Sequence, residues 1–467
     1  MTPLTLGIDL ATASARCVAL DTATGRIVAQ ADSALSPPER QPGGVSRQSP
    51  TYAPVALELV RRVCLQLGPD AARVAAVSVT GTSGTVVPVD RDGAAGGAAR
   101  LYDDTAGSDV LATAGLTGAS SLGRMVALRR ELPAARWAST PDVVNAALAG
   151  HAVSADTSHW LKAGIDLAAR RWPVDAMSAI GLDPADLRRL PELVLPGTRL
   201  GTVNAEVART LGVPESVRIV AGMTDGCTAQ IAAGAVHDGD TMGVLGTTLV
   251  LKAVSETPVE SADGAVYSHL APDGHYWAGG ASNAGAGILA VEFAGEDLAA
   301  LDQRVAETVA GYVRYPLSVA GERFPVADRN LPPLTDGEPR SRLDAYRALL
   351  EGVAFVERLG LERLQQLGVT PRRHVIAGGA TASPVWNRIR ATVLAPVVPV
   401  SVARSASSSV GAAILAAYAL TDRPLTEIVD RLVLTPEPVE PVATQRNSLE
   451  AAYLRFVDLV EGSLHHA

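Results

Sequence analysis

Short apolar stretches alternate with small polar turns along this chain, and three of them stand at its start. Residues 4–9, 17–21 and 26–31 are rich in Leu, Ile, Val and Ala, and the turns between them carry Thr, Ser and Gly. Apolar runs of about four to eight residues bounded by turn residues are typical of β-strands. The pattern therefore predicts a β-meander that begins at residue 4.

A second stretch repeats this pattern in the middle of the chain. An apolar run breaks at Gly246-Thr247-Thr248, and further strand-like runs continue to residue 279. Helix and strand patterns alternate after each meander. Such an internal duplication predicts an α/β fold of two similar domains with a cleft between them.

Amphipathic segments predict the main helices. Apolar residues recur at helical spacing in residues 49–68 and 340–367, which predicts a helix in each. Further helices are expected over residues 119–150 with breaks at Pro133 and Pro141, over 384–394 and 405–420, and from about residue 448.

The arrangement of these patterns also suggests domain boundaries. We expect an N-terminal domain over residues 1–235, a C-terminal domain over 236–425 and a helical tail over 426–467. The polar and aromatic segment 156–172 is expected to be a loop that lines or covers the cleft.

Composition narrows the class of protein. A chain of 467 residues exceeds one comfortable core, so two domains are the default. Hydrophobic residues make up 47% and charged residues 19%, which indicates a soluble globular enzyme with a large buried interior. The net charge of −9 without a basic run argues against nucleic acid as a partner and favours a neutral substrate.

Cysteine usage and the chain start bear on location. Cys17, Cys64 and Cys227 lie far apart and form no metal-binding or disulfide pattern, which favours a reduced cytoplasmic setting. The first strand follows Met1 almost at once, without the charged and apolar regions of a leader, and no apolar stretch is long enough to span a membrane. We therefore expect no membrane partner.

The stretch from residue 219 to 251 carries the first candidate chemistry. An apolar approach ends in Asp225, a helix-like run follows, and the next strand breaks at the turn 246–248. We interpret Asp225 as a general base beside a phosphate-holding loop. The alternative is a buried helix cap and an ordinary hairpin, which this stretch taken alone favours.

The first meander offers a matching turn. Asp9 ends the first strand, and Thr12 and Ser14 follow in a turn whose backbone N–H groups and hydroxyls can bind a phosphate. A carboxylate at this place can hold Mg²⁺ through water. A hairpin with a solvated acid is the competing interpretation.

Two further segments suit a sugar. Residues 81–85, Gly-Thr-Ser-Gly-Thr, form a polar turn after an apolar strand, and Asp103 and Asp104 follow Tyr102. Paired carboxylates accept hydrogen bonds from neighbouring hydroxyls, so these residues fit polyol recognition. A plain hairpin and a solvated loop are the alternatives.

These motifs resemble those of the FGGY carbohydrate kinases over nearly the whole chain. Residues 9–16 match the family's D-x-G-T-x-S-x-R turn, with Ala11 in place of Gly, and Asp225 and the turn 246–248 match its catalytic acid and second phosphate turn. Residues 378–387 match its adenosine motif, with Asn387 in place of Gln. The resemblance implies two duplicated actin-like domains of the ribonuclease H-like, hexokinase and Hsp70 type, with a cleft between them.

The resemblance also implies a reaction and its site residues. Asp225 would take a proton from the sugar, and Asp9 and Asp225 would hold Mg²⁺. The residues that would bind the nucleotide ATP are Thr12, Ser14, Arg16, Gly246, Thr247, Thr248, Gly379, Ala380 and Asn387. The residues that would bind the sugar are Asp9, Ser83, Asp103, Asp104 and Asp225.

Several short segments are similar to one branch of the family. Residues 81–85, 267–269, 279–283 and 321–325 look like the short branch of cyanobacteria and plants, which is associated with D-ribulose kinase activity and was earlier labelled xylulose kinase-like. A kinase for D-xylulose or another ketose or polyol remains an alternative. From a different class, an actin-like ATPase or a sugar-responsive regulator is possible, although the presence of both Asp9 and Asp225 argues against it. The family also leaves a homodimer open.

Overall fold

The computed structural model of the chain describes residues 2–116, 118 and 120–464. Its contacts divide the chain into two compact units, and each is described by itself. The first unit comprises Met1–Ala232, His269–Gly274 and Ser407–Leu434. The second comprises Ala233–Ser268, His275–Ala406 and Thr435–Ala467.

A six-stranded sheet forms the centre of the first unit. Its strands, in spatial order, are β12 (Arg199–Thr202), β13 (Arg218–Val220), β6 (Val74–Gly81), β1 (Leu4–Leu10), β2 (Ser14–Asp21) and β3 (Ile27–Ala34). Strands β1, β2 and β3 form the predicted antiparallel meander, and β6 runs parallel to β1. Small sheets add β4 (Glu39–Gln41), β5 (Val45–Gln48) and β8 (Ala99–Arg100), β7 (Val87–Val89) and β9 (Arg136–Ala138), and β10 (Ala155–Asp156) and β11 (Leu193–Val194).

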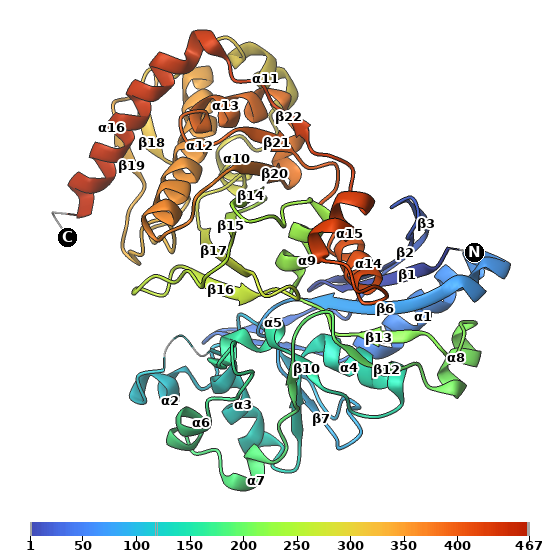
Figure 1. Cartoon of the computed structure of the whole chain (residues 1–467). Coiled ribbons are helices and arrows are strands. Elements are labelled where there is room, and N and C mark those ends of the chain that lie inside the picture. The colour runs from blue at the N-terminus through green and yellow to red at the C-terminus, as the bar shows by residue number, and fades with distance from the viewer. Residues whose placement is uncertain (1, 117, 119, 465–467) are drawn as a thin grey trace. The chain divides into compact units, whose positions relative to one another are not determined.

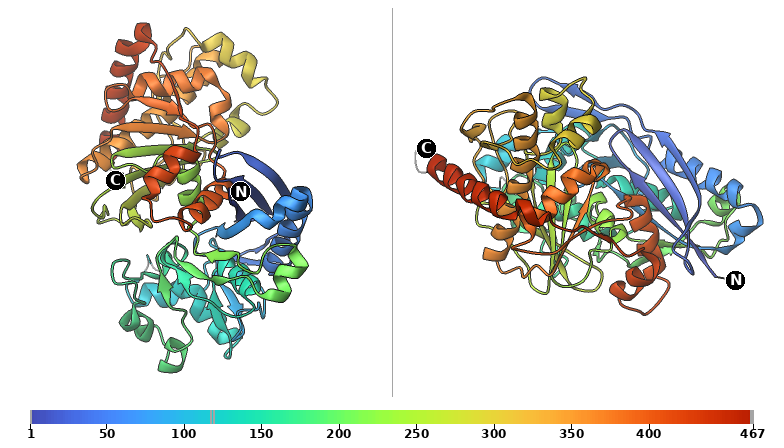
Figure 2. Two further views of the ribbon diagram at one scale, coloured as in Figure 1. Left: turned by 45° about the vertical axis from the view of Figure 1, so that its right-hand side comes forward. Right: turned by 90° about the horizontal axis from the view of Figure 1, so that it is seen from above.

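Helices cover both faces of this sheet (Figures 1 and 2). Alternate β1 residues such as Leu6 and Ile8 share a hydrophobic core with α1 (Tyr52–Leu67), as the period-2 pattern of a strand requires. Helix α14 (Ser408–Tyr418) packs on the other face, where Gly7 leaves no room for a side chain: a Cβ there would lie 1.9 Å from the Ser409 carbonyl oxygen. Asp9 lies two residues after Gly7 in the strand, so its side chain is on the same face of the sheet, the one that α14 covers.

The remaining helices of the first unit are short. They are α2 (Ser108–Thr113), α3 (Ser120–Glu131), α4 (Thr140–Ala149), α5 (Thr157–Trp160), α6 (Val174–Ala179), α7 (Pro184–Leu187), α8 (Ala205–Leu211), α9 (Asp225–Ala232) and α15 (Leu425–Leu432).

The second unit repeats the plan of the first. Its sheet has the order β16 (Tyr267–Leu270), β17 (Tyr276–Ser282), β15 (Leu249–Ser255), β14 (Asp240–Leu245), β20 (Arg373–Ala377), β21 (Val400–Val402) and β22 (Glu437–Pro438). Strands β14, β15 and β17 are antiparallel, and β20 and β21 follow in parallel. This sequence of directions matches β1, β2, β3, β6 and β13, so the predicted duplication is confirmed.

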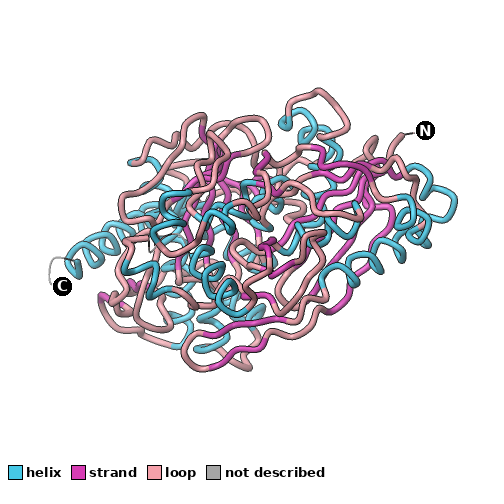
Figure 3. Tube along the Cα trace, turned by 90° about the horizontal axis from the view of Figure 1, so that it is seen from below, coloured by secondary structure: helices cyan, strands magenta, loops and turns pink. Residues whose placement is uncertain are grey.

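A large apolar core supports the second sheet. Helix α12 (Arg342–Gln366) supplies much of it, and the rings of Phe355 and Phe456 lie 5.6 Å apart within it. The other elements are α10 (Gly287–Glu292), α11 (Leu298–Val305), α13 (Pro384–Leu394), α16 (Arg446–Leu464), β18 (Val313–Tyr315) and β19 (Leu334–Asp336). Helix α16 is the long helix that leads to the C-terminus (Figure 3).

Three local expectations need correction. Strand β9 divides the expected helical region 119–150, of which residue 119 lies outside the described residues, and Pro141 helps to start α4 because Ser139 and Asp142 form a capping box before it. The segment 156–172 is not an open loop, since residues 157–160 form a buried helix. Residues 407–425, which we expected in the C-terminal domain, group with the first unit because α14 packs on β1 and β6.

No helix in the described part of the chain is long and apolar enough to cross a membrane. None of the three cysteines forms a disulfide within these residues.

Candidate active site

Two of the predicted carboxylates interact in the first unit. Asp9 lies near the end of β1, and Asp225 is the first residue of α9. The Asp9 Oδ1 atom is buried and accepts no hydrogen bond from any described residue. Burial and, to a smaller extent, the nearby negative charge of Asp225 raise the pKa of Asp9 to about 7, against the opposing charge of Arg16. A buried carboxylate with a strongly raised pKa is a candidate functional group.

Backbone contacts fix the position of Asp225. The Gly226 N–H donates to Asp225 Oδ1 at 2.6 Å, and the Ser408 and Thr228 hydroxyls both donate to the Asp225 carbonyl at 3.1 Å. Ser408 begins α14, so the helix that covers β1 also holds the predicted base. The peptide of Asp225 is therefore held from two other positions, Thr228 in the same helix and Ser408 in α14.

The sugar-side turn and the predicted base are brought together by the sheet. Gly81, the last residue of β6, forms a parallel β-bridge with Thr224, the residue before Asp225. The Thr80 hydroxyl donates to the Met223 carbonyl at 2.6 Å. Residues about 140 positions apart thus meet at one end of the sheet, where α/β proteins place ligands.

The first phosphate turn is accessible. Thr12 is half-buried, and Ser14 and Arg16 are exposed. Arg170 is the only non-glycine residue with positive φ in the described chain, so Ala11 adopts the turn without backbone strain. The Gln48 side-chain amide donates to the Thr12 carbonyl at 2.7 Å and supports the turn from within.

Ser83 presents an unsatisfied hydroxyl in the sugar-side turn. Its Oγ is buried and makes no hydrogen bond within the described residues, while its carbonyl accepts from Lys162 Nζ at 3.5 Å. Gly84 has a φ of +91°, which requires glycine, and its carbonyl accepts from Arg124 at 2.9 Å. Strand β7 after the turn belongs to a different sheet from β6, so the hairpin alternative is wrong.

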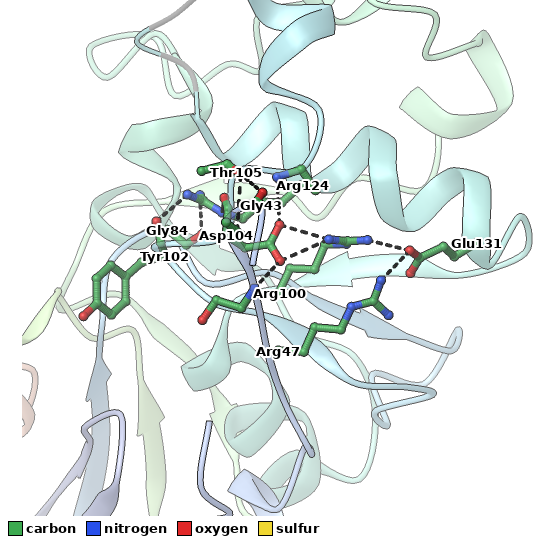
Figure 4. A network of polar contacts seen from close by, with 12 residues as sticks. Gly43, Arg47, Gly84, Arg100, Tyr102, Asp104, Thr105, Arg124 and Glu131 are labelled. Carbon is green, nitrogen blue, oxygen red and sulfur yellow. Dashed lines mark hydrogen bonds and ion pairs between the residues drawn. The ribbon is translucent and has the colours of Figure 1, made fainter. Parts of the chain in front are cut away.

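Asp104 has a structural role instead of the predicted sugar contact. Its buried side chain lies in a polar network with the buried Arg100 and, through Arg100, with the exposed Glu131 (Figure 4). Arg100 Nη1 donates to both Asp104 carboxylate oxygens at 2.9 and 3.1 Å, and the backbone N–H groups of Ser46 and Ala106 donate at 2.9 Å each. With Asp104 only 2% exposed, no lone pair is left for a substrate.

Asp103 is accessible, in contrast to its neighbour. Its carboxylate forms an ion pair with Arg40 Nε at 2.9 Å, and a third of its side chain is exposed. Its other carboxylate oxygen, Oδ1, takes no part in this ion pair.

In the second unit, the turn 246–248 is held by the start of α10. The Ala286 N–H donates to the Gly246 carbonyl at 2.9 Å, and the Gly287 N–H donates to the Thr247 carbonyl at 3.0 Å. A Cβ at Gly287 would lie 2.6 Å from the Thr247 side chain. Thr247 is exposed and Thr248 is half-buried, so both are at least partly accessible.

A cavity of about 620 Å³ lies beside the predicted adenosine turn. Gly379 and Ala380 line it, and so do three aromatic side chains, Phe293, Tyr346 and Trp386. An apolar cavity of this size suits a nucleoside. Phe293, the residue that directly follows α10, was not among the predicted site residues.

Two residues shape the adenosine turn without lining the cavity. Gly378 has a φ of +93°, and a Cβ there would lie 2.4 Å from the Leu245 carbonyl oxygen, so glycine lets this turn approach the end of β14. Asn387 is 7% exposed and donates to the Thr381 carbonyl at 2.9 Å, while its Oδ1 makes no hydrogen bond within the described residues. Asn387 therefore supports the turn from behind.

The carboxylates suit a hard cation. No group of three His, Cys, Asp or Glu side chains in the described chain could hold a metal ion by itself. The orphaned buried oxygen of Asp9 beside Asp225 fits Mg²⁺, which usually binds through one or two carboxylates together with water and substrate phosphates.

Comparisons with known proteins point to one family. Residues 241–420 match the C-terminal domain of the FGGY family of carbohydrate kinases. The chain is 25% identical over 273 residues to a xylulose kinase of Staphylococcus epidermidis, which covers 56% of this chain and 55% of that protein. It is 28% identical over 294 residues to a ribulokinase of Mycolicibacterium smegmatis, which covers 56% of this chain and 51% of that protein.

A solved structure extends the similarity to the whole chain. The crystal structure of a xylulose kinase from Rhodospirillum rubrum is similar over 99% of both chains, with a TM-score of 0.85 and 25% identity. The predicted fold of two duplicated actin-like domains is thereby confirmed. In sequence, the chain spans about half the length of the curated relatives that it matches.

Proposed function

The chain belongs to the FGGY family of carbohydrate kinases, and on this premise we propose that it transfers the γ-phosphate of ATP to the terminal hydroxyl of a ketopentose, with D-ribulose as the first candidate. The observation that carries the proposal is the pair of interacting carboxylates, Asp9 and Asp225, at the end of the first sheet that also carries Ser83.

Asp225 acts as the general base in this proposal. Its carboxylate takes the proton of the terminal hydroxyl as that oxygen attacks the γ-phosphorus in line with the leaving group. Such a base contributes about 10²–10⁴-fold to the rate. Asp9 and Asp225 hold Mg²⁺, which when bound neutralises charge on the β- and γ-phosphates.

Each unit supplies one turn with residues suited to phosphate oxygens. Thr12, Ser14 and Arg16 grip phosphate oxygens from the first unit. Gly246, Thr247 and Thr248 do the same from the second unit, and the cavity beside Gly379 and Ala380 takes adenosine. The chain thereby binds phosphates through backbone N–H groups and hydroxyls.

Ser83, Asp103 and Asp9 recognise the sugar. The unsatisfied Ser83 hydroxyl and the accessible Asp103 carboxylate supply hydrogen bonds to neighbouring hydroxyls of an open-chain ketose. D-ribulose ranks first because the segments 81–85 and 267–269 resemble the short ribulose kinase-like branch. D-xylulose is the second candidate, because a xylulose kinase is among the relatives of this chain.

We place the protein in the cytoplasm, with a sugar and ATP as its small-molecule partners. Its three buried cysteines without a disulfide fit a reducing compartment. A homodimer is an expectation from the family and is checked by sedimentation.

A coupled ADP-release screen over ketoses and polyols, with a control that lacks sugar, tests the proposal. We expect ADP release that depends on D-ribulose and exceeds the release with D-xylulose. Higher ADP release with D-xylulose would change the proposed substrate to D-xylulose and leave the proposed kinase activity unchanged. Release that is equal with and without every sugar would favour an actin-like ATPase and contradict the proposal.

A further inference from the structure

A buried histidine links the sugar-side turn to a group of acids. His159 Nδ1 lies 2.7 Å from Asp156 Oδ2, and His159 Nε2 lies 3.3 Å from the Gly81 carbonyl oxygen. The residue is 2% exposed, so neither nitrogen exchanges its partner for water. None of the proposed catalytic steps uses this side chain.

The two partners determine the protonation of the ring. A backbone carbonyl only accepts hydrogen bonds, and the carboxylate of Asp156 already accepts the His159 backbone N–H at 2.8 Å through its other oxygen. A neutral imidazole has one N–H and can satisfy only one of these acceptors. Both contacts are hydrogen bonds only when His159 is an imidazolium.

The charges around the ring favour that form. Asp156 precedes α5, Asp142 faces the ring from α4, and Asp225 faces it from α9. Burial alone would lower the pKa of His159, but the three carboxylates outweigh it and raise the pKa. Asp142 shares this environment, since burial and the charge of Asp156 raise its own pKa to about 6.

The contact acts at the junction of the proposed sugar site. Gly81 ends β6, leads to Ser83 two residues later and forms the bridge to Thr224, which precedes Asp225. A displacement of the Gly81 peptide therefore moves the sugar-binding hydroxyl and the base relative to each other.

We propose that His159 is a positioning residue which, as an imidazolium, ties the Gly81 carbonyl to Asp156 and so fixes the sugar-binding turn against the segment that carries Asp225. This inference deepens the proposed sugar kinase function and rests on it. The nucleotide residues of the second unit are independent of the contact.

The charge state of the ring is measured first, because it does not depend on activity. The protein is labelled with ¹⁵N-histidine, and the His159→Gln variant identifies the His159 signals among the eight histidines. At about pH 7.5, where an ordinary histidine with a pKa of about 6.5 is mostly neutral, we expect both His159 nitrogens to show imidazolium shifts. A neutral ring at this pH overturns the inference whether or not the chain is a kinase.

Kinetics then test the consequence for the sugar site. We expect His159→Gln to raise the sugar KM about tenfold and to leave the ATP KM unchanged, because one charge-assisted hydrogen bond to the turn is lost. Asp156→Asn should act in the same direction. The exposed residue His151 provides the control, and His151→Gln should change neither constant.

The pH dependence separates positioning from general stability. His159 contributes while it is protonated, so the wild-type sugar KM should rise on the alkaline side and the His159→Gln value should stay flat. Equal increases in the sugar KM and the ATP KM of His159→Gln would contradict the inference. So would a sugar KM that rises with pH in the variant as it does in the wild type.

If circular dichroism shows that His159→Gln does not fold, the kinetics of Asp156→Asn and the pH profile of the wild type still decide. The absence of ADP release with every sugar would refute the proposed function and leave the NMR result standing.

Discussion

The two units place different chemistry on the same strand plan. In the first, β1 ends in Asp9 and Leu10 before its turn; in the second, β14 ends in Val244 and Leu245 before its turn. Asp9 pairs with Arg16 in register, whereas Val244 pairs with Val250. Both turns carry the residues that we propose for phosphate binding, but only the first has a carboxylate beside it.

The pKa values of two acids, Asp9 in the first unit and Glu357 in the second, show a similar difference. Burial raises the pKa of Asp9 to about 7 because no cation outweighs it. In the second unit, burial would also raise the pKa of Glu357, but Arg390 at 2.6 Å and His374 at 3.0 Å lower it to about 2. Glu357, whose charge two neighbouring cations offset, therefore belongs to the framework, whereas Asp9, whose raised pKa shows no such offset, is a candidate for the functional site.

The largest expected stability effect is in the framework. Glu357→Gln leaves the fully buried Arg390 guanidinium without its counter-charge, which should cost about 3–5 kcal/mol in the free energy of unfolding. Urea denaturation measures it, and Glu256→Gln at an exposed position of the same unit should change it by less than about 0.5 kcal/mol. A loss below about 1 kcal/mol for Glu357→Gln would mean that the ion pair is not structural.

The same ion pair predicts an acid limit. The folded pKa of Glu357 is depressed from 4.5 to about 2, so its contribution is present above about pH 4.5 and disappears as the pH falls towards about 2. The shift corresponds to about 3 kcal/mol of wild-type stability. Acid titration of the wild type should show this loss, and Glu357→Gln should lack it.

Asp9→Asn should change the free energy of unfolding in the opposite direction and stabilise the protein. Ionisation of Asp9 in the fold is unfavourable, so wild-type stability falls as the pH rises from about 3.8 to about 7, by up to about 4 kcal/mol. At about pH 8, without Mg²⁺ or nucleotide, the substitution should raise the unfolding free energy by about 1–3 kcal/mol while activity falls. At about pH 4 this gain in unfolding free energy should vanish. An equal gain at pH 4 and pH 8 would show that ionisation of Asp9 does not destabilise the fold.

Ser383→Ala should give the smallest effect. The Ser383 hydroxyl caps α13 by accepting the Trp386 N–H at 3.0 Å and donates to Asp302 at 2.6 Å beside the nucleoside cavity. Its loss should cost about 1 kcal/mol and raise the ATP KM a few-fold. Ser341→Ala removes the matching cap of α12, so it should cost the same stability without any change in the ATP KM.

Local signals explain what the sequence could predict. The expected helix 384–394 is α13 to the residue, because a capping Ser383 and Pro384 mark its start. The two meanders and their turns could also be predicted, since apolar runs and turn residues are local features of the sequence. These segments contain most of the predicted site residues.

Long-range contacts account for the rest. Asp104 lost its predicted role in part because the backbone N–H of Ser46, which is distant in the sequence, donates to its carboxylate in the folded chain beside the nearby Arg100. Helix α14 joined the first unit because Gly7 lets it approach β1, which no pattern within residues 405–420 reveals. Residues 156–160 are mostly polar, so the sequence did not show that they are buried. Distant partners in the fold, including the Gly81 carbonyl and the Thr224 N–H, satisfy part of this segment.

The central claim is that Asp225 activates a sugar hydroxyl for phosphoryl transfer. Its most direct test is sugar-dependent ADP release by the wild type and by Asp225→Ala, with ADP binding measured in parallel by calorimetry. We predict that kcat falls by about 10²–10⁴-fold while the Kd for ADP is unchanged, because the cavity proposed for adenosine lies in the second unit. Near-wild-type turnover by Asp225→Ala would contradict the account.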